Sequence, residues 1–247
     1  MASEPLGYGL HRGVPFEEYL RIPAISASAS KVYAETGSLL AVRECSTERA
    51  TAAQRVGTLF HMFLLETERF KSRVTVGGPI NPKTGNAYGR DTKAWAEWEA
   101  ANPDAIVLTA QEVEAFRRMA ERVAEHPIAS KYLLSGGAVR EATMLWRYTW
   151  REGDGTERSV DVRGRPDYLR EDEPIIVDLK TTELSVSPRE LERRYHKWGY
   201  HRQAAVYCHG YHAILGTRPR MIFVNVQTVA PYECVVVELP PRAVDQG

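Results

Sequence analysis

The chain has 247 residues, of which 43% are hydrophobic and 26% charged, and its 32 basic and 32 acidic residues give a formal net charge of zero. This composition is ordinary for a soluble globular protein with one sizeable core, and zero net charge argues against a nucleic-acid coat protein, which is normally basic overall. No run of residues approaches the ~20 apolar residues that a membrane helix needs, and the N-terminus lacks the layout of a secretory signal.

The first part of the chain, to about residue 140, is predicted to be mainly helical. Within residues 13–45, the stretch Ile25-Ser26-Ala27-Ser28 precedes a helix expected over about Ser30–Glu35. A second helix is expected to follow Gly57, because apolar residues then recur at helical spacing. These residues are Leu59, Phe60, Phe63 and Leu64.

Two further helices are expected after a turn-rich stretch. Gly77–Arg90 reads GGPINPKTGNAYGR, and its glycine, proline and asparagine content predicts a mobile loop. Helices then follow over about Lys93–Ala101 and Gln111–Glu125. The second of them opens with a capping-box pattern, Thr109-Ala110-Gln111-Glu112.

The pattern changes to strands after Ala142. Thr143–Arg151 is aromatic and β-branched, Glu152-Gly153-Asp154-Gly155 is typical of a turn, and Arg158–Arg163 alternates polar with apolar residues. Together these segments predict a β-hairpin. Ile175–Leu179 (IIVDL) then predicts a buried strand.

The remaining elements complete an α/β fold. Ser187-Pro188-Arg189-Glu190 predicts a helix start, and that helix, or a broken pair of helices, is expected to continue through His212. Met221–Gln227 and Tyr232–Glu238 predict two closing strands. We therefore expect a mixed central β-sheet flanked by helices, in a single domain over residues 1–247. Its helical part would end at about 140, and its catalytic sheet and helices would occupy about 141–240.

The strongest candidate for chemistry lies around the buried strand. Alternation of side chains places Asp178 and Lys180 on one face of that strand, where such groups are costly to bury unless they are paired or bind an ion. Asp167 follows a Gly-Arg-Pro bend, and a neighbouring strand could bring it beside Asp178. A buried Asp–Lys ion pair that merely closes the strand is the alternative interpretation.

Two carboxylates at a strand end form a hard-oxygen site that suits Mg²⁺ or Mn²⁺. Such a metal polarises a phosphodiester and lowers the pKa of a bound water. Lys180 would hold or deprotonate that water and stabilise the developing negative charge. The residues around Asp167 and Asp178 therefore predict phosphodiester hydrolysis.

Three other side chains and two basic clusters are weaker candidates. His61 lies in an apolar helix, where a histidine is usually a core residue unless it supplies a metal ligand. Gln203 and Tyr207 lie four residues apart, hence on one helix face, and either contact the site or form an ordinary polar rim. Basic residues gather between Arg158 and Arg170 and from Arg189 to Lys197, as a DNA track or as a solvated face.

Four motifs together resemble a known group of nucleases. They are Arg-Pro-Asp at Arg165–Asp167, Val-Asp-Leu-Lys-Thr-Thr at Val177–Thr182, Gln-x-x-x-Tyr at Gln203–Tyr207, and Gly-Thr-x-x-His-x-x-Leu-Leu-Glu at Gly57–Glu66. Together they resemble the RecB-like branch of the PD-(D/E)XK superfamily. Within it, they are most similar to the catalytic region of exonuclease VIII (RecE) and its phage or prophage relatives. The resemblance extends from about residue 20 to 240.

The resemblance implies a restriction-endonuclease-like core and a processive exonuclease. Such an enzyme degrades the 5′ strand of linear double-stranded DNA and releases 5′-phosphomononucleotides. It leaves 3′ single-stranded tails for a partner annealing protein in homologous recombination. Relatives of this type assemble as homo-oligomeric rings around DNA, and a basic lumen inside such a ring would be compatible with zero net charge.

The resemblance also implies roles for individual residues. The implied metal ligands are His61, Asp167, Asp178 and the backbone carbonyl of Leu179. The residues implied to complete catalysis are Lys180, Gln203 and Tyr207, with Glu141 also lining the site. The residues expected to contact DNA are Ser28, Arg165 and Arg202, Ser28 from a helix N-terminus that suits a terminal phosphate.

The cysteines exclude some cofactors. Cys45, Cys208 and Cys234 are dispersed, so neither a disulfide framework nor a cysteine zinc site is expected, and a reducing cytoplasm fits best. Relatives with an iron–sulfur cluster carry four cysteines, so no cluster is expected here.

Two other functions stay open from the sequence. The first is a structure-specific or restriction-type endonuclease on the same fold. The second is a non-catalytic DNA-binding protein with a decayed nuclease fold. The intact Asp167, Asp178 and Lys180 argue against the second, because decay normally removes one of them.

Overall fold

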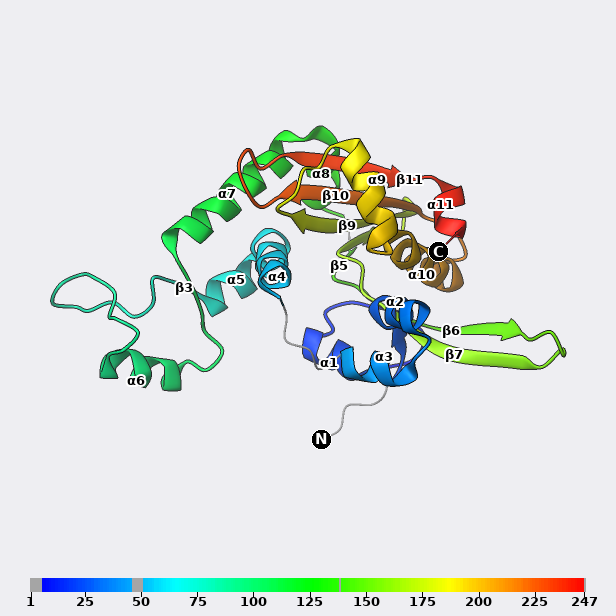
Figure 1. Cartoon of the computed structure of the whole chain (residues 1–247), viewed down its shortest axis with the longest axis horizontal. Coiled ribbons are helices and arrows are strands. Elements are labelled where there is room, and N and C mark those ends of the chain that lie inside the picture. The colour runs from blue at the N-terminus through cyan, green and yellow to red at the C-terminus, as the bar shows by residue number, and fades with distance from the viewer. Residues whose placement is uncertain (1–5, 46–50, 138, 247) are drawn as a thin grey trace.

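The central element of the computed structural model, which describes residues 6–45, 51–137 and 139–246, is a five-stranded sheet (Figure 1). Its strands lie in the order β11 (Cys234–Leu239), β10 (Arg220–Gln227), β9 (Ile175–Thr182), β8 (Tyr168–Arg170) and β5 (Val139–Arg140). β9 and β10 are parallel, and the other neighbours are antiparallel. The predicted mixed sheet is therefore confirmed.

Helices cover both faces of this sheet. Ile175, Val177 and Leu179 point to one face and pack with apolar residues of α4 (Ala52–Leu65), α7 (Ala110–Glu125) and α8 (Pro127–Leu133). Ile176 and Phe223 belong to a second apolar cluster with α9 (Pro188–Lys197) and α10 (Tyr200–Leu215). Asp178 alternates with Val177 and Leu179, so it faces the α9 and α10 side of the sheet.

The predicted hairpin belongs to a second sheet, not to the central one. β6 (Thr143–Arg151) and β7 (Glu157–Gly164) pair antiparallel, flanked by β1 (Gly9–His11) and β2 (Ile25–Ser26). The hairpin extends away from the rest of the molecule (Figure 1). The β6–β7 ladder ends at Gly164, just before Pro166, which has no N–H to donate. The chain then turns at this bend from the hairpin into the central sheet.

The N-terminal helices are α1 (Phe16–Arg21), α2 (Ala27–Thr36) and α3 (Leu39–Cys45). The expected start of the second of these at Ser30 is three residues late. The Ser26 side chain accepts a hydrogen bond from the Ala29 amide at 3.2 Å and so caps the helix earlier. The side chain of Cys45 lies outside the described part of the chain.

α4 begins before Gly57, which corrects the expected helix start. Thr51 and Gln54 form a capping box that begins the helix at Ala52. Gly57 instead lies inside the helix, where an added Cβ would come within 2.9 Å of Thr181 Oγ1. This glycine therefore allows α4 to approach the end of β9 closely.

The middle of the chain forms an arm. α5 (Thr67–Arg73) leads to β3 (Val74–Val76), which pairs in parallel with β4 (Ile106–Leu108). Between these strands lie the predicted turn-rich loop and α6 (Lys93–Ala101), which extend from the body (Figure 1). The predicted capping box of α7 is present, with Thr109 and Glu112 bonded reciprocally.

The C-terminal part confirms the broken pair of helices. α9 ends at Lys197, and α10 starts after Gly199, whose φ of 66° is a left-handed conformation that glycine adopts readily. α11 (Pro241–Asp245) ends the described part. Among the described helices, none has the length and apolar character to cross a membrane.

Candidate active site

Asp167 lies where the chain enters the central sheet. β8 and β9 pair with Tyr168 opposite Val177, so one further step of this register brings Asp167 opposite Asp178. The Asp167 side chain is buried, and its Oδ2 accepts a hydrogen bond from the Leu179 amide at 2.5 Å. The expected juxtaposition of the two aspartates on neighbouring strands is therefore what the structure shows.

Asp178 is buried at 3% exposure and lies between a lysine and an amide. Gln203 Nε2 donates a hydrogen bond to Asp178 Oδ1 at 2.9 Å. Asp178 Oδ2 forms an ion pair with Lys180 Nζ but has no hydrogen bond of standard geometry within the described structure. A buried carboxylate oxygen with this deficit has capacity for a further positive partner.

His61 reaches the same place from the opposite face of the sheet. Its Nε2–H donates to the Leu179 carbonyl oxygen at 2.8 Å, and its Nδ1 lies 3.3 Å from Asp167 Oδ1. A metal-binding histidine commonly donates its other ring N–H to a carbonyl in this way. The imidazole is therefore held with Nδ1 facing the carboxylates.

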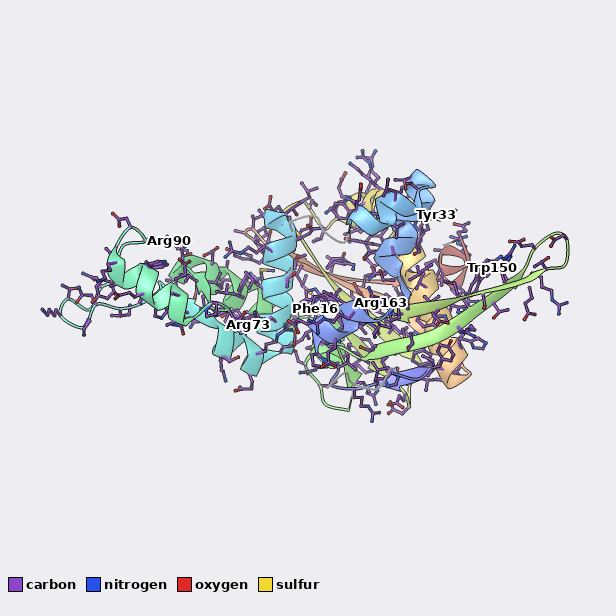
Figure 2. The ribbon with its side chains drawn as sticks, turned by 90° about the horizontal axis from the view of Figure 1, so that it is seen from below. Phe16, Tyr33, Arg73, Arg90, Trp150 and Arg163 are labelled. Carbon is purple, nitrogen blue, oxygen red and sulfur yellow. The ribbon has the colours of Figure 1, made fainter. Side chains whose placement is uncertain are left out.

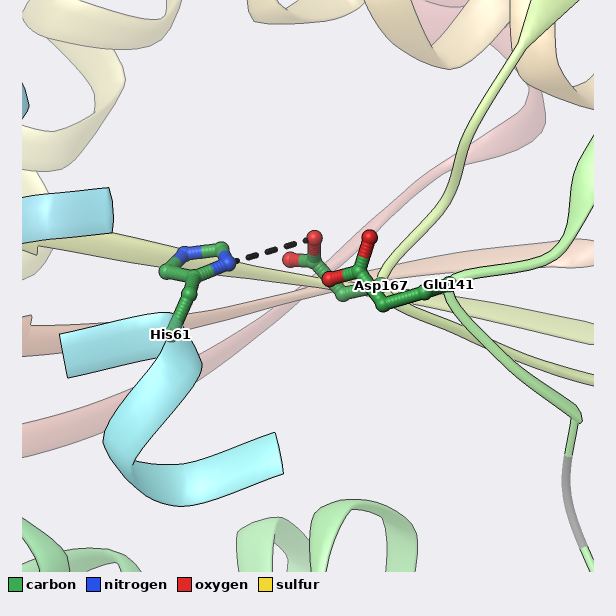
Figure 3. Close-up of side chains that lie close together, drawn as sticks. All are labelled: His61, Glu141 and Asp167. Carbon is green, nitrogen blue, oxygen red and sulfur yellow. Dashed lines mark ion pairs between the residues drawn. The ribbon is translucent and has the colours of Figure 1, made fainter. Parts of the chain in front are cut away.

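Glu141 completes a three-residue cluster (Figure 3). The ligand atoms of His61, Glu141 and Asp167 all lie within 4.8 Å of one another. Glu141 has a φ of 50°, which is unusual for a residue other than glycine, and its N–H donates to the Asp167 carbonyl at 3.0 Å. Backbone strain of this kind is concentrated at functional sites.

The cluster is electrostatically crowded. Burial first, and then the nearby Asp167, raise the pKa of Glu141 to about 7. Burial also raises the pKa of Asp178 to about 6 despite the Lys180 ammonium. Burial alone would lower the pKa of His61, but the Asp167 carboxylate raises it to about 9. Burial would also raise the pKa of Asp167, but the neighbouring His61 lowers it. Burial therefore disfavours the charged forms of Glu141 and Asp178 in particular, and a cation beside them would favour those forms.

These donors fit a hard divalent cation. Carboxylate oxygens with one imidazole suit Mg²⁺ or Mn²⁺, and the crowded carboxylates would ionise more readily beside positive charge. Asp178 Oδ2 supplies a buried oxygen that lacks a hydrogen bond. The Leu179 carbonyl accepts from His61, and its second lone pair leaves capacity for a metal.

Two of the other predicted residues lie in the scaffold of the site. Tyr207 is buried, and its hydroxyl donates to the Arg165 carbonyl at 3.2 Å, two residues before Asp167. The Arg165 guanidinium lies in the interior and donates to Glu141 Oε2 at 2.8 Å and to the Val14 carbonyl at 2.8 Å. These contacts hold Arg165 within the protein, and its contact with DNA stays a prediction.

The remaining expected DNA contacts lie outside this cluster. Ser28 is exposed in the first turn of α2, where Ser26 supplies the cap. Arg202 is half-buried on α10, next in sequence to Gln203. The basic stretch from Arg158 to Arg170 is largely paired internally, since Arg163 donates to the carbonyls of Tyr19, Leu20 and Ile22.

Tyr200 is a site residue that the sequence reasoning missed. Lys180 Nζ lies 4.8 Å from the centroid of the Tyr200 ring and 5.7 Å from that of Phe223. The two rings stack with centroids 5.5 Å apart. The spacing of Tyr200, Gln203 and Tyr207 could have revealed it, because positions three and seven residues along a helix share one face.

We expect Tyr200→Leu to lower kcat about 5- to 10-fold with little change in KM, because a ring face holds an ammonium by about 1 kcal/mol or more. Tyr200→Phe keeps the ring and should restore near-normal turnover. The measurement is steady-state cleavage of linear DNA, with Tyr33→Leu as the control because Tyr33 is 50% exposed on α2. Equal loss in the leucine and phenylalanine variants would contradict a role for the ring.

Comparison with known proteins agrees with this geometry. The family model for a "PDDEXK-like domain of unknown function (DUF3799)" matches residues 27–247. No curated protein shows significant similarity to the chain. The family match therefore begins with α2 and includes the whole five-stranded sheet.

Two solved structures are similar to the chain. One, from Eubacterium rectale, is described as a candidate exonuclease and has a TM-score of 0.59 at 14% identity, over 96% of this chain and 81% of that chain. At that identity the likeness concerns the fold. The other, SSO0001, has a TM-score of 0.30 at 18% identity, over 55% of this chain and 65% of that chain, which is too weak to support an argument.

Proposed function

Since the chain belongs to the family of PDDEXK-like domains of unknown function, we propose that it is a divalent-metal-dependent deoxyribonuclease that acts on the ends of linear double-stranded DNA. The observation that carries this proposal is the convergence of His61, Glu141 and Asp167 beside the Asp178–Lys180 pair. Carboxylates, one imidazole and one lysine are the groups that metal-assisted phosphodiester hydrolysis requires.

Each residue has a defined task in this proposal. His61, Asp167, Asp178 and the Leu179 carbonyl would hold Mg²⁺ or Mn²⁺, with Glu141 as a further oxygen donor. When bound, the metal supplies positive charge to the phosphodiester and acidifies a water. Gln203 fixes the Asp178 carboxylate through their 2.9 Å hydrogen bond.

Lys180 acts here as a positive charge. Burial would lower the pKa of Lys180, but the Asp178 carboxylate raises it above its usual value. The protonated ammonium can donate to a phosphate oxygen or to the attacking water, and it stabilises the charge that develops on the phosphate. This arrangement favours an electrostatic role over proton abstraction by the lysine.

The finer assignment draws on the resemblance to exonuclease VIII. It comprises 5′-to-3′ degradation, release of 5′-phosphomononucleotides, and 3′ tails that a single-strand annealing protein would use in recombination. It also includes a homo-oligomeric ring, which would explain processivity. The four motifs support this assignment over most of the chain.

A structure-specific or restriction-type endonuclease on the same fold is the second candidate, because the cluster itself can hydrolyse any phosphodiester that reaches it. A non-catalytic DNA-binding protein is the third, and the presence of Asp167, Asp178 and Lys180 together argues against it, because decay normally removes one of them. Covalently closed circular DNA discriminates the first two, since it has no ends.

The test is digestion of linear duplex DNA labelled separately at its 5′ and 3′ ends, with Mg²⁺ and beside a closed circle. We expect early release of 5′-labelled mononucleotide, an intact circle, and no activity in Lys180→Ala or with a chelator. Cutting of the circle would establish an endonuclease instead. Absence of cleavage with every divalent metal would leave a binding protein.

A further inference from the structure

A cavity of about 490 Å³ opens beside the cluster of His61, Glu141 and Asp167, on the side of Glu141. Its lining includes four arginines, Arg69, Arg73, Arg140 and Arg165, together with Phe16 and three glutamates, Glu17, Glu66 and Glu141. Its volume lies within the roughly 300–1,000 Å³ typical of small-molecule sites. Because Glu141 belongs both to the cavity and to the cluster, a molecule in the cavity would lie directly beside the candidate reaction centre.

Two of these arginines neutralise carboxylates of the cavity wall. Arg69 Nη1 lies 2.9 Å from Glu66 Oε2, and Arg69 Nη2 lies 3.6 Å from Glu17 Oε1. Arg165 Nε is bonded to Glu141 at 2.8 Å. The paired part of the wall thus has two guanidinium groups against three carboxylates, and Arg73 and Arg140 bring the formal charge of the whole lining to +1.

The other two arginines keep unused donors. Arg73 approaches Asp104 only to 3.7 Å, beyond hydrogen-bond distance, and its side chain is 33% exposed. Arg140 donates through Nη2 to the Leu133 carbonyl at 3.0 Å. Neither guanidinium has a further hydrogen-bond partner among the described residues. Each is therefore a planar donor that can bind a phosphate through two N–H groups.

Phe16, on α1, lines the same cavity as Arg73; both residues are labelled in Figure 2. Phe16 is 42% exposed, and its ring stacks with that of Tyr19 at 6.1 Å between centroids. Arg165 Cζ lies 5.9 Å from the centroid of its ring. Nucleic-acid bases stack on exposed aromatic rings of this kind without sequence preference.

We propose that this cavity binds one nucleotide of a DNA strand, with its phosphate on Arg73 and Arg140 and its base against Phe16. The inference rests on the proposed nuclease function and locates part of its substrate. The nucleotide held there adjoins the phosphodiester that is presented to Asp167 and Asp178. The cavity would thus position the strand by binding one nucleotide next to the bond that is cut.

The test is calorimetric titration of deoxyadenosine 5′-monophosphate into the purified protein without divalent metal, so that no cleavage is needed. We expect binding, and binding of deoxyadenosine, which lacks the phosphate, at least about tenfold weaker. Arg73→Gln should weaken binding of the nucleotide about tenfold by removing a charged donor. Phe16→Ala should also weaken it about tenfold by removing the stacking surface.

Arg118→Gln is the matched control, because Arg118 lies on α7 and forms ion pairs with Glu114 and Glu121. It should bind the nucleotide as the unmodified protein does. The inference would be overturned by absence of nucleotide binding, or by binding that stays within twofold in both cavity variants. Thermal unfolding of each variant confirms that it is folded.

The nuclease function and the nucleotide-binding cavity can be refuted independently. A protein that cleaves DNA but binds the nucleotide equally well in all variants retains the nuclease function and loses the cavity assignment. A protein without cleavage under any metal, in which Arg73→Gln still weakens binding, has a nucleotide site and a different function.

Discussion

Asp178→Asn is expected to lower the rate of DNA cleavage by about 10²- to 10³-fold. The substitution keeps the shape of the side chain and an oxygen that can accept from Gln203, but it removes the negative charge that faces Lys180. Loss of one charged metal ligand removes several kcal/mol of transition-state stabilisation, which corresponds to that range of rates. The measurement is initial-rate digestion of linear duplex DNA with saturating Mg²⁺.

The same substitution should leave the protein folded. Asp178 is one of several crowded carboxylates, and burial already raises its pKa to about 6, so removing its charge relieves repulsion from Asp167. Lys180 retains the Tyr200 ring at 4.8 Å. We therefore expect a small change in the midpoint of thermal unfolding and a weaker affinity for Mn²⁺ in a calorimetric titration.

Asp172→Asn is the matched control for this experiment. Asp172 is exposed, pairs with Arg170 and lies between β8 and β9. Normal cleavage in this variant with loss in Asp178→Asn would assign the effect to the buried carboxylate. Full turnover in Asp178→Asn would instead reduce the Asp178–Lys180 pair to a buried ion pair that closes the strand.

The elements that could be predicted carry their signal within their own residues. The capping box at Thr109 begins α7. The aromatic and β-branched residues of Thr143–Arg151 and the alternation over Arg158–Arg163 predict the hairpin. β5 and β8 were missed because they have two and three residues and form only by pairing with neighbours. A pattern so short contains no periodicity to detect.

The start of α4 could not be predicted from its neighbouring residues alone. Gly57 resembles a helix boundary, since glycine disfavours helices by about 1 kcal/mol relative to alanine. In the fold it is required inside the helix, because the chain must pass close to Thr181 on β9. Only the tertiary contact explains why the helix tolerates glycine there.

Part of the site could be predicted from the alternation of side chains along one strand. Alternation in β9 places Asp178 and Lys180 on one face, and the antiparallel step from β8 brings Asp167 beside them. The central position of Glu141 depends on its φ of 50° and on its bond to the Asp167 backbone. Neither feature has a signature in the residues around Glu141.

Arg165 illustrates a contact that the sequence does not show. The resemblance implies that Arg165, which precedes Asp167 by two residues, contacts DNA. In the fold its guanidinium is paired with Glu141, which lies 24 residues earlier in the chain. Burial of a charged residue depends on a partner distant in sequence, and the sequence alone does not identify that partner.

The second large effect is expected on stability, from Phe60→Ala. Phe60 is fully buried on α4, and its ring centroid lies 5.9 Å from that of Phe116 on α7. Replacing a buried phenylalanine with alanine leaves a cavity and lowers the free energy of unfolding by about 3–5 kcal/mol. Urea denaturation followed by circular dichroism measures this change, and Leu184→Ala, at a residue 56% exposed, should change it by less than about 0.5 kcal/mol.

The activity of the same variant separates the two faces of α4. Phe60 points into the apolar core, and the next residue, His61, faces Asp167 at 3.3 Å. At a temperature where the variant is folded, cleavage per folded molecule should stay within about tenfold of the unmodified protein, far above that of Asp178→Asn. A loss of cleavage as large as in Asp178→Asn would show that packing at Phe60 sets the position of His61. If Phe60→Ala lowers the free energy of unfolding by less than about 1 kcal/mol, α4 must have moved to fill the cavity. The Phe60–Phe116 contact would then not be what holds α4 against the sheet.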